Sequence, residues 1–196
     1  MTTPVTVISC LYGRTHDRFL WEWLNAVRRL DPAPAEVIIA TDRFRHITDG
    51  ALEVFRRRNH GWRYPQAFYL NKALEHVETE WVWQLDVDDI AFADALDGIS
   101  FDTAPYVVQM GFERSDGLIH LPQWGGPINQ YVAGSLIRTS AIRHVGGFRD
   151  VEHQDSDLWE RLIEAGYVFA SADRPRFFYR RHGEARTERE ARALTV

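Results

Sequence analysis

Residues 81–89 read Trp-Val-Trp-Gln-Leu-Asp-Val-Asp-Asp, an apolar, strand-forming run that stops at three carboxylates, Asp86, Asp88 and Asp89. A buried strand of an open α/β sheet carries the residues that follow it to the carboxyl edge of the sheet, where ligands bind in this class of fold. We therefore expect these carboxylates to face a crevice. The stretch predicts both an α/β fold and the place of its functional site.

Two interpretations of the three carboxylates stay open at this stage. Closely spaced carboxylates repel one another, and a bound divalent cation that prefers oxygen ligands, Mg²⁺ or Mn²⁺, would relieve the repulsion. Alternatively, Asp88 and Asp89 begin a turn or cap a helix over residues 91–96, because aspartate is favoured at helix N-caps.

The composition indicates a folded protein with a sizeable core, since 45% of its 196 residues are hydrophobic and 13% are aromatic. The net charge of −5 and the pI near 5.9 argue against general nucleic-acid binding, although Arg56–Arg58 and Arg63 form one local basic cluster. A single cysteine, Cys10, excludes a disulfide framework and suits a reducing compartment. No run approaches the ~20 apolar residues of a membrane helix, and the amino terminus lacks signal-peptide features, so we expect a cytoplasmic protein without a membrane span.

The first half of the chain alternates strands with helices. Strands are predicted over residues 5–10, 36–41 and 81–86, and helices over 51–58 and 67–77. A further helix, ended by Asp31-Pro32, is predicted by apolar residues at helical spacing: Leu20, Trp23, Leu24, Val27 and Leu30. The short connections favour parallel βαβ units.

The second half has a different pattern. Residues 106–112 and 118–121 flank Arg114-Ser115-Asp116-Gly117, which predicts a hairpin and therefore a mixed sheet. A helix is expected over 158–163, and Asp157 with Glu160 fits a capping box at its start. Asp155 would then stand just outside this helix, free to point into a cleft.

Taken together, these motifs resemble those of the family 2 glycosyltransferases, which have the GT-A fold. That family's Asn-x-Gly, its asparagine at a helix start and its Asp-x-Asp-Asp are matched by residues 59–61, Asn71 and residues 86–89. Its Gly-Gly-Phe, acidic pair and Leu-Trp-x-Arg-Leu are matched at residues 146–148, 154–155 and 158–162. The similarity runs from about Val5 to His182.

The resemblance implies an α/β GT-A fold, with a Rossmann-like nucleotide half, a mixed central sheet and a smaller acceptor-binding half. Residues 1–182 would form a single domain, in which 1–90 bind the nucleotide sugar and 91–182 bind the acceptor and carry out catalysis. Residues 183–196, rich in arginine and glutamate, would be a charged tail.

It also implies a metal-dependent, inverting glycosyltransferase that moves a sugar from a nucleotide-sugar donor, with a UDP-sugar favoured, to an acceptor hydroxyl. Asp86 would face the nucleotide or its ribose, Asp88 would hold Mn²⁺ or Mg²⁺ on the diphosphate, and Asp155 would be the general base. The chemistry agrees with these roles. A divalent ion neutralises the charge that develops on the leaving diphosphate, and a carboxylate takes the proton of the attacking hydroxyl.

Further residues complete the predicted site. The donor is assigned Tyr12, Arg14, Asp42 and Asn71, the metal is assigned His182, and the acceptor sugar is assigned Trp124. An imidazole suits a metal shell, and an indole ring stacks well on a sugar. Both have plainer alternatives: His182 as an exposed histidine without function, and Trp124 as a core aromatic.

The chain departs from the family pattern at three positions. Thr41 and Gln154 stand where the family commonly has the first residue of an acidic pair, and Gly13 replaces a frequent asparagine. Two alternatives follow: a catalytically inactive nucleotide-sugar-binding module and, less favoured, a metal-dependent nucleotidyltransferase. No glycine-rich phosphate loop with a lysine follows the first strand, which argues against the latter. The short chain also makes lipid acceptors and processive synthesis less expected.

Overall fold

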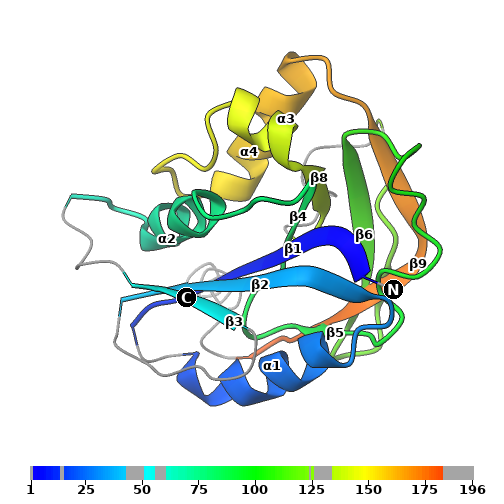
Figure 1. Ribbon diagram of the computed structural model, residues 1–196, viewed down its shortest axis with the longest axis horizontal. Helices are drawn as coiled ribbons and strands as arrows, with labels where there is room; N and C mark the ends of the chain where they lie inside the picture. The colour runs from blue at the N-terminus through cyan, green and yellow to red at the C-terminus, as the bar shows by residue number, and fades with distance from the viewer. Residues whose placement is uncertain are drawn as a thin grey trace, which may run out of the picture.

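A mixed sheet of nine strands runs through the part of the chain that the structure describes, and helices cover both of its faces (Figure 1). That structure, a computed structural model, describes residues 2–13, 16–42, 51–55, 61–123, 125 and 134–182. The strand order is β3-β2-β1-β4-β8-β6-β9-β5, and β7 pairs with β6 off this path. The predicted mixed α/β architecture is confirmed.

Four parallel strands form the first half of the sheet: β1 (Thr2–Leu11), β2 (Ala33–Thr41), β3 (Ala51–Phe55) and β4 (Trp81–Gln84). The strands predicted in the regions of β1, β2 and β4 are confirmed. The helix predicted over 51–58 is wrong where the chain is described, because Ala51–Phe55 pairs in register with the end of β2. A sheet edge offers unpaired backbone groups, and pairing with them outweighs a weak local helix preference.

Antiparallel pairing makes the second half mixed. β8 (Leu136–Arg138) runs antiparallel to β4 and to β6 (Val107–Arg114), whereas β6 runs parallel to β9 (Phe169–Tyr179). β7 (Ile119–His120) pairs antiparallel with β6, which confirms the predicted hairpin. β8 and β6 thus separate β9 from β4 within the sheet.

The helix predicted over 91–96 does not form. Residues 90–91 are instead a short strand, β5 (Ile90–Ala91), which pairs antiparallel with Phe177 and Phe178 of β9. The Phe92 N–H also donates to the Arg176 carbonyl. Because β9 takes these backbone groups, turns rather than a helix follow over 93–98.

Helices lie on opposite faces of the sheet. α1 (Leu20–Arg28), preceded by the 3-10 turn η1 (Asp17–Phe19), lies on one face, as Figure 1 shows. The other face is covered by α2 (Pro65–Leu74), α3 (Thr139–His144) and α4 (Gln154–Glu164). None of the described helices is long and apolar enough to cross a membrane.

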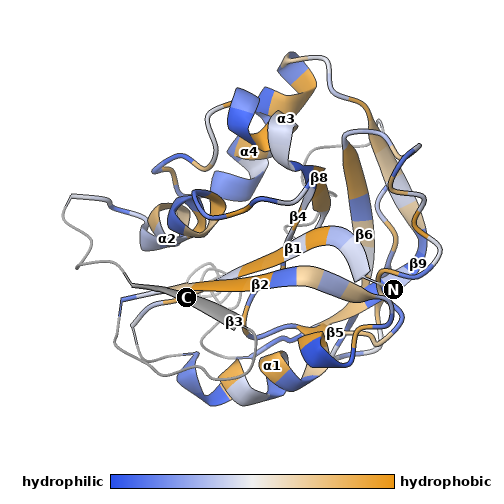
Figure 2. Cartoon of the chain, in the orientation of Figure 1, coloured by the Kyte–Doolittle hydropathy of each residue, from blue (hydrophilic) through white to orange (hydrophobic). Residues whose placement is uncertain are grey.

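The side chains of β1 alternate between two hydrophobic clusters. Val5 and Val7 pack in the cluster of α1, whereas Ile8 and Cys10 pack in the cluster of α2, α3 and α4. This alternation follows from the two-residue period of a strand. Figure 2 shows hydrophobic colour on the central strands and alternating hydrophobic and hydrophilic colour along the helices. The apolar stripe predicted over 20–30 is buried, as expected.

The start of α4 differs from the predicted capping box. The helix begins at Gln154 and not at Asp157, and the Asp157 N–H already donates to the His153 carbonyl. Asp157 therefore lies inside the first turn, where its carboxylate pairs with Arg161 at 2.6 Å. Asp155 likewise lies in the first helical turn and not outside the helix. Arg161 also donates to the carbonyl oxygens of Val145 and Gly147, and this tertiary contact takes Asp157 away from a capping role.

Candidate functional site

Three parallel strands deliver polar residues to one edge of the sheet. β1, β2 and β4 end at this edge, and Tyr12, Asp42 and residues 86–89 follow them. These residues therefore meet at the sheet edge where the sequence predicted the functional site. Carboxyl edges of parallel strands are the usual ligand sites of such sheets.

Residues 86–89 form a tight turn, in which the Asp89 N–H donates to the Asp86 carbonyl at 3.0 Å. Asp86 is half-buried, and its Oδ1 atom accepts hydrogen bonds from Gln84 and Gln66, each at 3.3 Å. Gln66 belongs to the first turn of α2. Asp86 is thus held in place by its own strand and by a helix of the neighbouring layer.

Asp89 has a different environment from Asp86 and Asp88. It is buried, and its Oδ1 atom accepts the Arg180 N–H at 3.1 Å. Burial raises the pKa of Asp89 well above its usual range, and the charges of Asp88 and Asp86 raise this pKa further. Burial, together with the same two charges, also raises the pKa of the Cys10 thiol. The acidic turn therefore creates a negative potential that its neighbours experience, and a bound cation would relieve it.

The end of β9 brings His182 to this turn. The Arg180 side chain donates to the Asp88 carbonyl at 3.0 Å, which ties residues 180–182 to the turn after β4. Two positions further on, His182 Nε2 lies 2.8 Å from Asp88 Oδ2. The structure thus brings together the two residues predicted as metal ligands, although 94 positions separate them.

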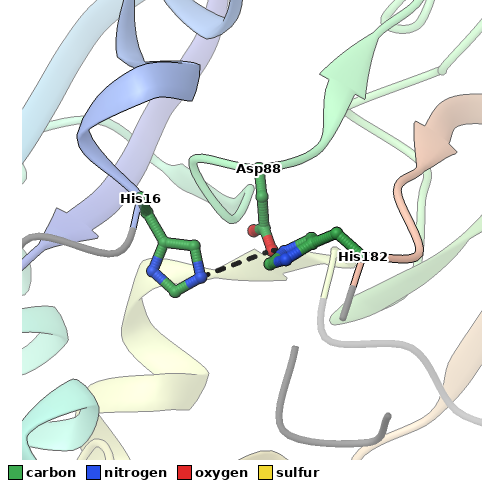
Figure 3. A group of neighbouring side chains, drawn as sticks. All are labelled: His16, Asp88 and His182. Atoms are coloured by element: carbon green, nitrogen blue, oxygen red, sulfur yellow. Dashed lines mark hydrogen bonds and ion pairs between the residues drawn. The ribbon is translucent and has the colours of Figure 1, made fainter. Parts of the chain in front are cut away.

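A second histidine, His16, reaches the same carboxylate. Figure 3 shows His16 and His182 approaching Asp88 from either side. His16 Nε2 lies 3.8 Å from Asp88 Oδ2, and one potential ligand atom from each of the three residues lies within 4.8 Å of the others. His16 was not predicted from the sequence. Its position in the loop after the first strand, at the same sheet edge as Asp88, was the available signal.

These three residues fit a divalent metal ion. An octahedral ion about 2.1 Å from its ligands places adjacent ligand atoms about 3 Å apart and opposite ones about 4.2 Å apart. The distances of 2.8 and 3.8 Å from Asp88 Oδ2 are close to these two spacings. The side chains of His16, Asp88 and His182 are 30%, 19% and 10% exposed, so the group is held by the protein but open on one side.

The loop after β1 contains Tyr12 and Arg14, two of the residues predicted to bind the nucleotide. Tyr12 stacks on Tyr69 of α2, with ring centroids 5.5 Å apart and planes 12° apart. Asp42 accepts the Gly13 N–H at 3.0 Å and so joins the ends of β1 and β2; Gly13 adopts φ +63°, which a glycine tolerates best. Arg14 lies outside the described residues.

Asn71, predicted as a donor ligand, joins two segments of the fold. Its Nδ2 donates to the Phe148 carbonyl at 2.7 Å, and its Oδ1 accepts the Phe148 N–H at 2.9 Å. Both ends of the amide group therefore join α2 to the loop before α4. The role of Asn71 as a donor ligand stays a prediction.

Asp155 lies at the start of α4, and the segment that leads to it is fixed on α2. Asp150 accepts the N–H groups of Arg63 and Tyr64 at 2.9 and 2.7 Å, just before α2 begins. α2 in turn contacts Asp86 through Gln66. A series of contacts thus connects the amino end of α4 with the acidic turn.

Asp155 itself is half-buried, and its Oδ1 accepts the Ser156 N–H. Trp124, predicted to bind the acceptor, lies outside the described residues.

Comparisons with known proteins find similarity in structure and not in sequence. No protein-family model matches the chain, and no curated protein matches its sequence. Residues 1–349 of S. aureus TarS in complex with UDP match with a TM-score of 0.70 over 92% of this chain, at 18% identity. The UDP-GlcNAc complex of the same protein matches with a TM-score of 0.68 over 91%, at 16% identity. The mannosyltransferase PcManGT of Pyrobaculum calidifontis, in complex with GDP-Man and Mn²⁺, matches with a TM-score of 0.64 over 96%, at 18% identity.

The fold is that of the GT-A glycosyltransferases. The predicted fold class is confirmed. The chain spans 61% and 58% of the two TarS structures and 59% of PcManGT.

Proposed function

We propose that this protein is a metal-dependent, inverting glycosyltransferase of the family 2 type, which transfers a sugar from a nucleotide-sugar donor to an acceptor hydroxyl. The observation that carries the proposal is the pairing of Asp88 with His182 at the carboxyl edge of the parallel strands. In a GT-A fold, this edge is a suitable place for the diphosphate of a donor. The structural neighbours in complex with UDP-GlcNAc and with GDP-Man and Mn²⁺ support it.

The donor would lie across the ends of β1, β2 and β4. Asp86 would accept hydrogen bonds from the ribose or base, and Tyr12, Arg14 and Asp42 would surround the base. A UDP-sugar is the favoured donor, because the TarS complexes hold UDP and UDP-GlcNAc. Residues 1–90 then form the donor half and residues 91–182 the acceptor half.

Asp88 and His182 would hold the divalent ion, Mn²⁺ or Mg²⁺. When bound, the ion supplies positive charge to the leaving nucleoside diphosphate. The protein's own contribution is to hold Asp88 in a fixed place, through the Arg180 contact to its carbonyl and the turn that starts at Asp86.

Asp155 would act as the general base. A carboxylate can accept several hydrogen bonds at once, so the Ser156 N–H leaves Asp155 able to take the proton of an acceptor hydroxyl. Attack by this hydroxyl on the anomeric carbon, from the side opposite the leaving diphosphate, inverts that carbon. Trp124 would stack on an acceptor sugar.

The experiment that tests the proposal is calorimetry with a panel of nucleoside diphosphates and nucleotide sugars, with and without Mn²⁺. The native chain is compared with Asp88→Ala and with Asp102→Ala, which removes an exposed carboxylate from the turns before β6. We expect one nucleotide to bind in a Mn²⁺-dependent way, and binding to be lost only in Asp88→Ala. If no nucleotide binds under either condition, the proposal is wrong.

Binding alone does not establish transfer, so the donor identified in this way is next incubated with an acceptor panel. Transfer with inversion supports the full proposal. Donor binding with neither transfer nor hydrolysis would instead identify a nucleotide-sugar-binding module, the alternative suggested by Thr41 and Gln154.

A further inference from the structure

His16 is the one residue of the metal-ligating group that neither the sequence motifs nor the resemblance pointed to. It lies between β1 and η1, and its ring approaches the Asp88 carboxylate on the side away from His182 (Figure 3). We infer that His16 is a third protein ligand. The three side chains then form a two-histidine, one-carboxylate site that binds a divalent transition metal before any nucleotide arrives.

The number of ligands separates two kinds of site. A site with one or two protein ligands depends on the diphosphate to complete the coordination of the metal, so metal and nucleotide bind together. Three protein ligands within 4.8 Å of one another can hold a metal ion without any nucleotide. An octahedral ion held by three side chains keeps three open positions, which suffice for diphosphate oxygens and water. In this respect the inference rests on the proposed function; binding of the metal itself does not.

The two imidazole rings share a common aromatic neighbour that holds them in place. Phe19 is buried, and its ring lies 5.1 Å from the His182 ring and 6.3 Å from the His16 ring, between centroids. The guanidinium groups of Arg18 and Arg180 each lie 4.7 Å from the Phe19 centroid. Both histidine rings already contact the buried Phe19 ring. Few side-chain conformations are therefore lost when a metal binds, and this favours metal binding without nucleotide.

The tautomer of His182 is not fixed by the rest of the described chain. Its Nδ1 atom is buried and has no hydrogen-bond partner among the described residues, whereas Nε2 faces Asp88. The ring can therefore place its proton on Nδ1 and present the Nε2 lone pair to a metal, as metal ligation by a neutral imidazole requires.

The ligand set predicts which metal the site prefers. Imidazole nitrogen suits later transition metals such as Ni²⁺ and Zn²⁺, and the affinity of a nitrogen and oxygen site rises from Mn²⁺ to Co²⁺, whereas Mg²⁺ prefers oxygen ligands and gives up water reluctantly. A site with two histidines should therefore bind Co²⁺ more tightly than Mn²⁺, and Mn²⁺ more tightly than Mg²⁺, in the absence of any nucleotide. A site of Asp88 and diphosphate oxygens alone would discriminate much less against Mg²⁺.

The first test titrates Mn²⁺, Co²⁺ and Mg²⁺ into nucleotide-free protein, followed by calorimetry and by the electron paramagnetic resonance signal of free Mn²⁺. The variants are His16→Ala and the matched control His144→Ala, which removes an exposed imidazole from the end of α3. We expect at least about a tenfold loss of Mn²⁺ affinity in His16→Ala, in line with the 10–100-fold effects of perturbing a metal shell, and no change in the control. Equal affinity of native and His16→Ala protein would overturn the inference.

A second measurement needs no variant and so does not depend on its folding. Pulsed electron paramagnetic resonance of the Mn²⁺-loaded native protein detects nitrogen nuclei coupled to the metal, and two coupled imidazoles are expected. One coupled imidazole would overturn the inference, because His16 would then only pair with Asp88.

The two proposals fail in distinguishable ways. Nucleotide binding that depends on Asp88 but not on His16, with one coupled imidazole, would retain the proposed function and reject the third ligand. Two coupled imidazoles without binding of any nucleotide would retain the third ligand and reject the proposed function.

Discussion

Asn71 holds Phe148 by both ends of its amide group: Nδ2 donates to the Phe148 carbonyl at 2.7 Å, and Oδ1 accepts the Phe148 N–H at 2.9 Å. The pair joins α2, whose Gln66 contacts Asp86, to the loop that leads to Asp155. One side chain thus connects the two parts of the candidate site without touching either carboxylate.

Replacing Asn71 by alanine should destabilise the fold by about 2–3 kcal/mol, because the buried N–H and carbonyl of Phe148 lose their partners. Urea unfolding monitored by circular dichroism measures this loss. The control is Lys72→Ala on the same helix, which removes an ion pair with the exposed Glu75 and should cost less than about 1 kcal/mol. Equal losses in the two variants would contradict the structural role given to Asn71.

Gly147 and Gly166 form a matched pair for testing the space beside Asn71. Both have positive φ, +70° and +81°, but a Cβ on Gly147 would lie 2.5 Å from Asn71 Oδ1, whereas a Cβ on Gly166 would meet nothing within 4 Å. Gly166→Ala should therefore cost about 1–2 kcal/mol for the left-handed backbone alone. Gly147→Ala should cost about 1–3 kcal/mol more, because Asn71 must also move. Thermal unfolding of both variants measures the difference. Similar melting temperatures would show that the Asn71 side chain moves aside at little cost in stability.

Arg161 should be important for stability. It is buried, and it bonds to the Asp157 carboxylate and to the carbonyl oxygens of Val145 and Gly147. Arg161→Ala should cost about 3–5 kcal/mol, because it leaves a half-buried carboxylate and two carbonyls without their donor. Arg149 also approaches Asp157, at 3.7 Å, but is mostly exposed, and Arg149→Ala should change stability by less than about 1 kcal/mol. Chemical denaturation of the two variants measures this contrast.

Asp155→Asn should lower the rate of sugar transfer by about 10²–10⁴-fold, the usual contribution of a general base. Nucleotide-sugar affinity should be unchanged, because the proposed donor contacts lie on other residues. Steady-state transfer assays and calorimetry on one preparation measure both quantities. Glu164→Gln, an exposed neutralisation at the other end of α4, is the matched control. Full turnover in Asp155→Asn would assign the base to another residue.

The pattern of residues along the chain predicted the elements whose hydrophobic period is strong. The alternation in β1, the apolar stripe of α1 and the run that ends at Asp86 were each readable locally, because a strand or an amphipathic helix must bury one face wherever it packs. The acidic turn after β4 followed in the same way. The pairing of Asp88 with His182 was anticipated only through the resemblance to a family.

Tertiary structure decided the rest. Residues 51–55 and 90–91 became strands because neighbouring strands offered backbone partners. Arg161 is fixed by the carbonyl oxygens of Val145 and Gly147, and it takes the Asp157 carboxylate away from a capping role. The place of His16 beside Asp88, and the use of Asn71 to hold Phe148, depend on how distant segments pack against one another. Local sequence determines the period and the preferred backbone conformation of a segment. Which side chains meet across the fold is determined only when the strands pair and the helices cover the sheet, because those distances are set by packing and not by any single stretch of chain.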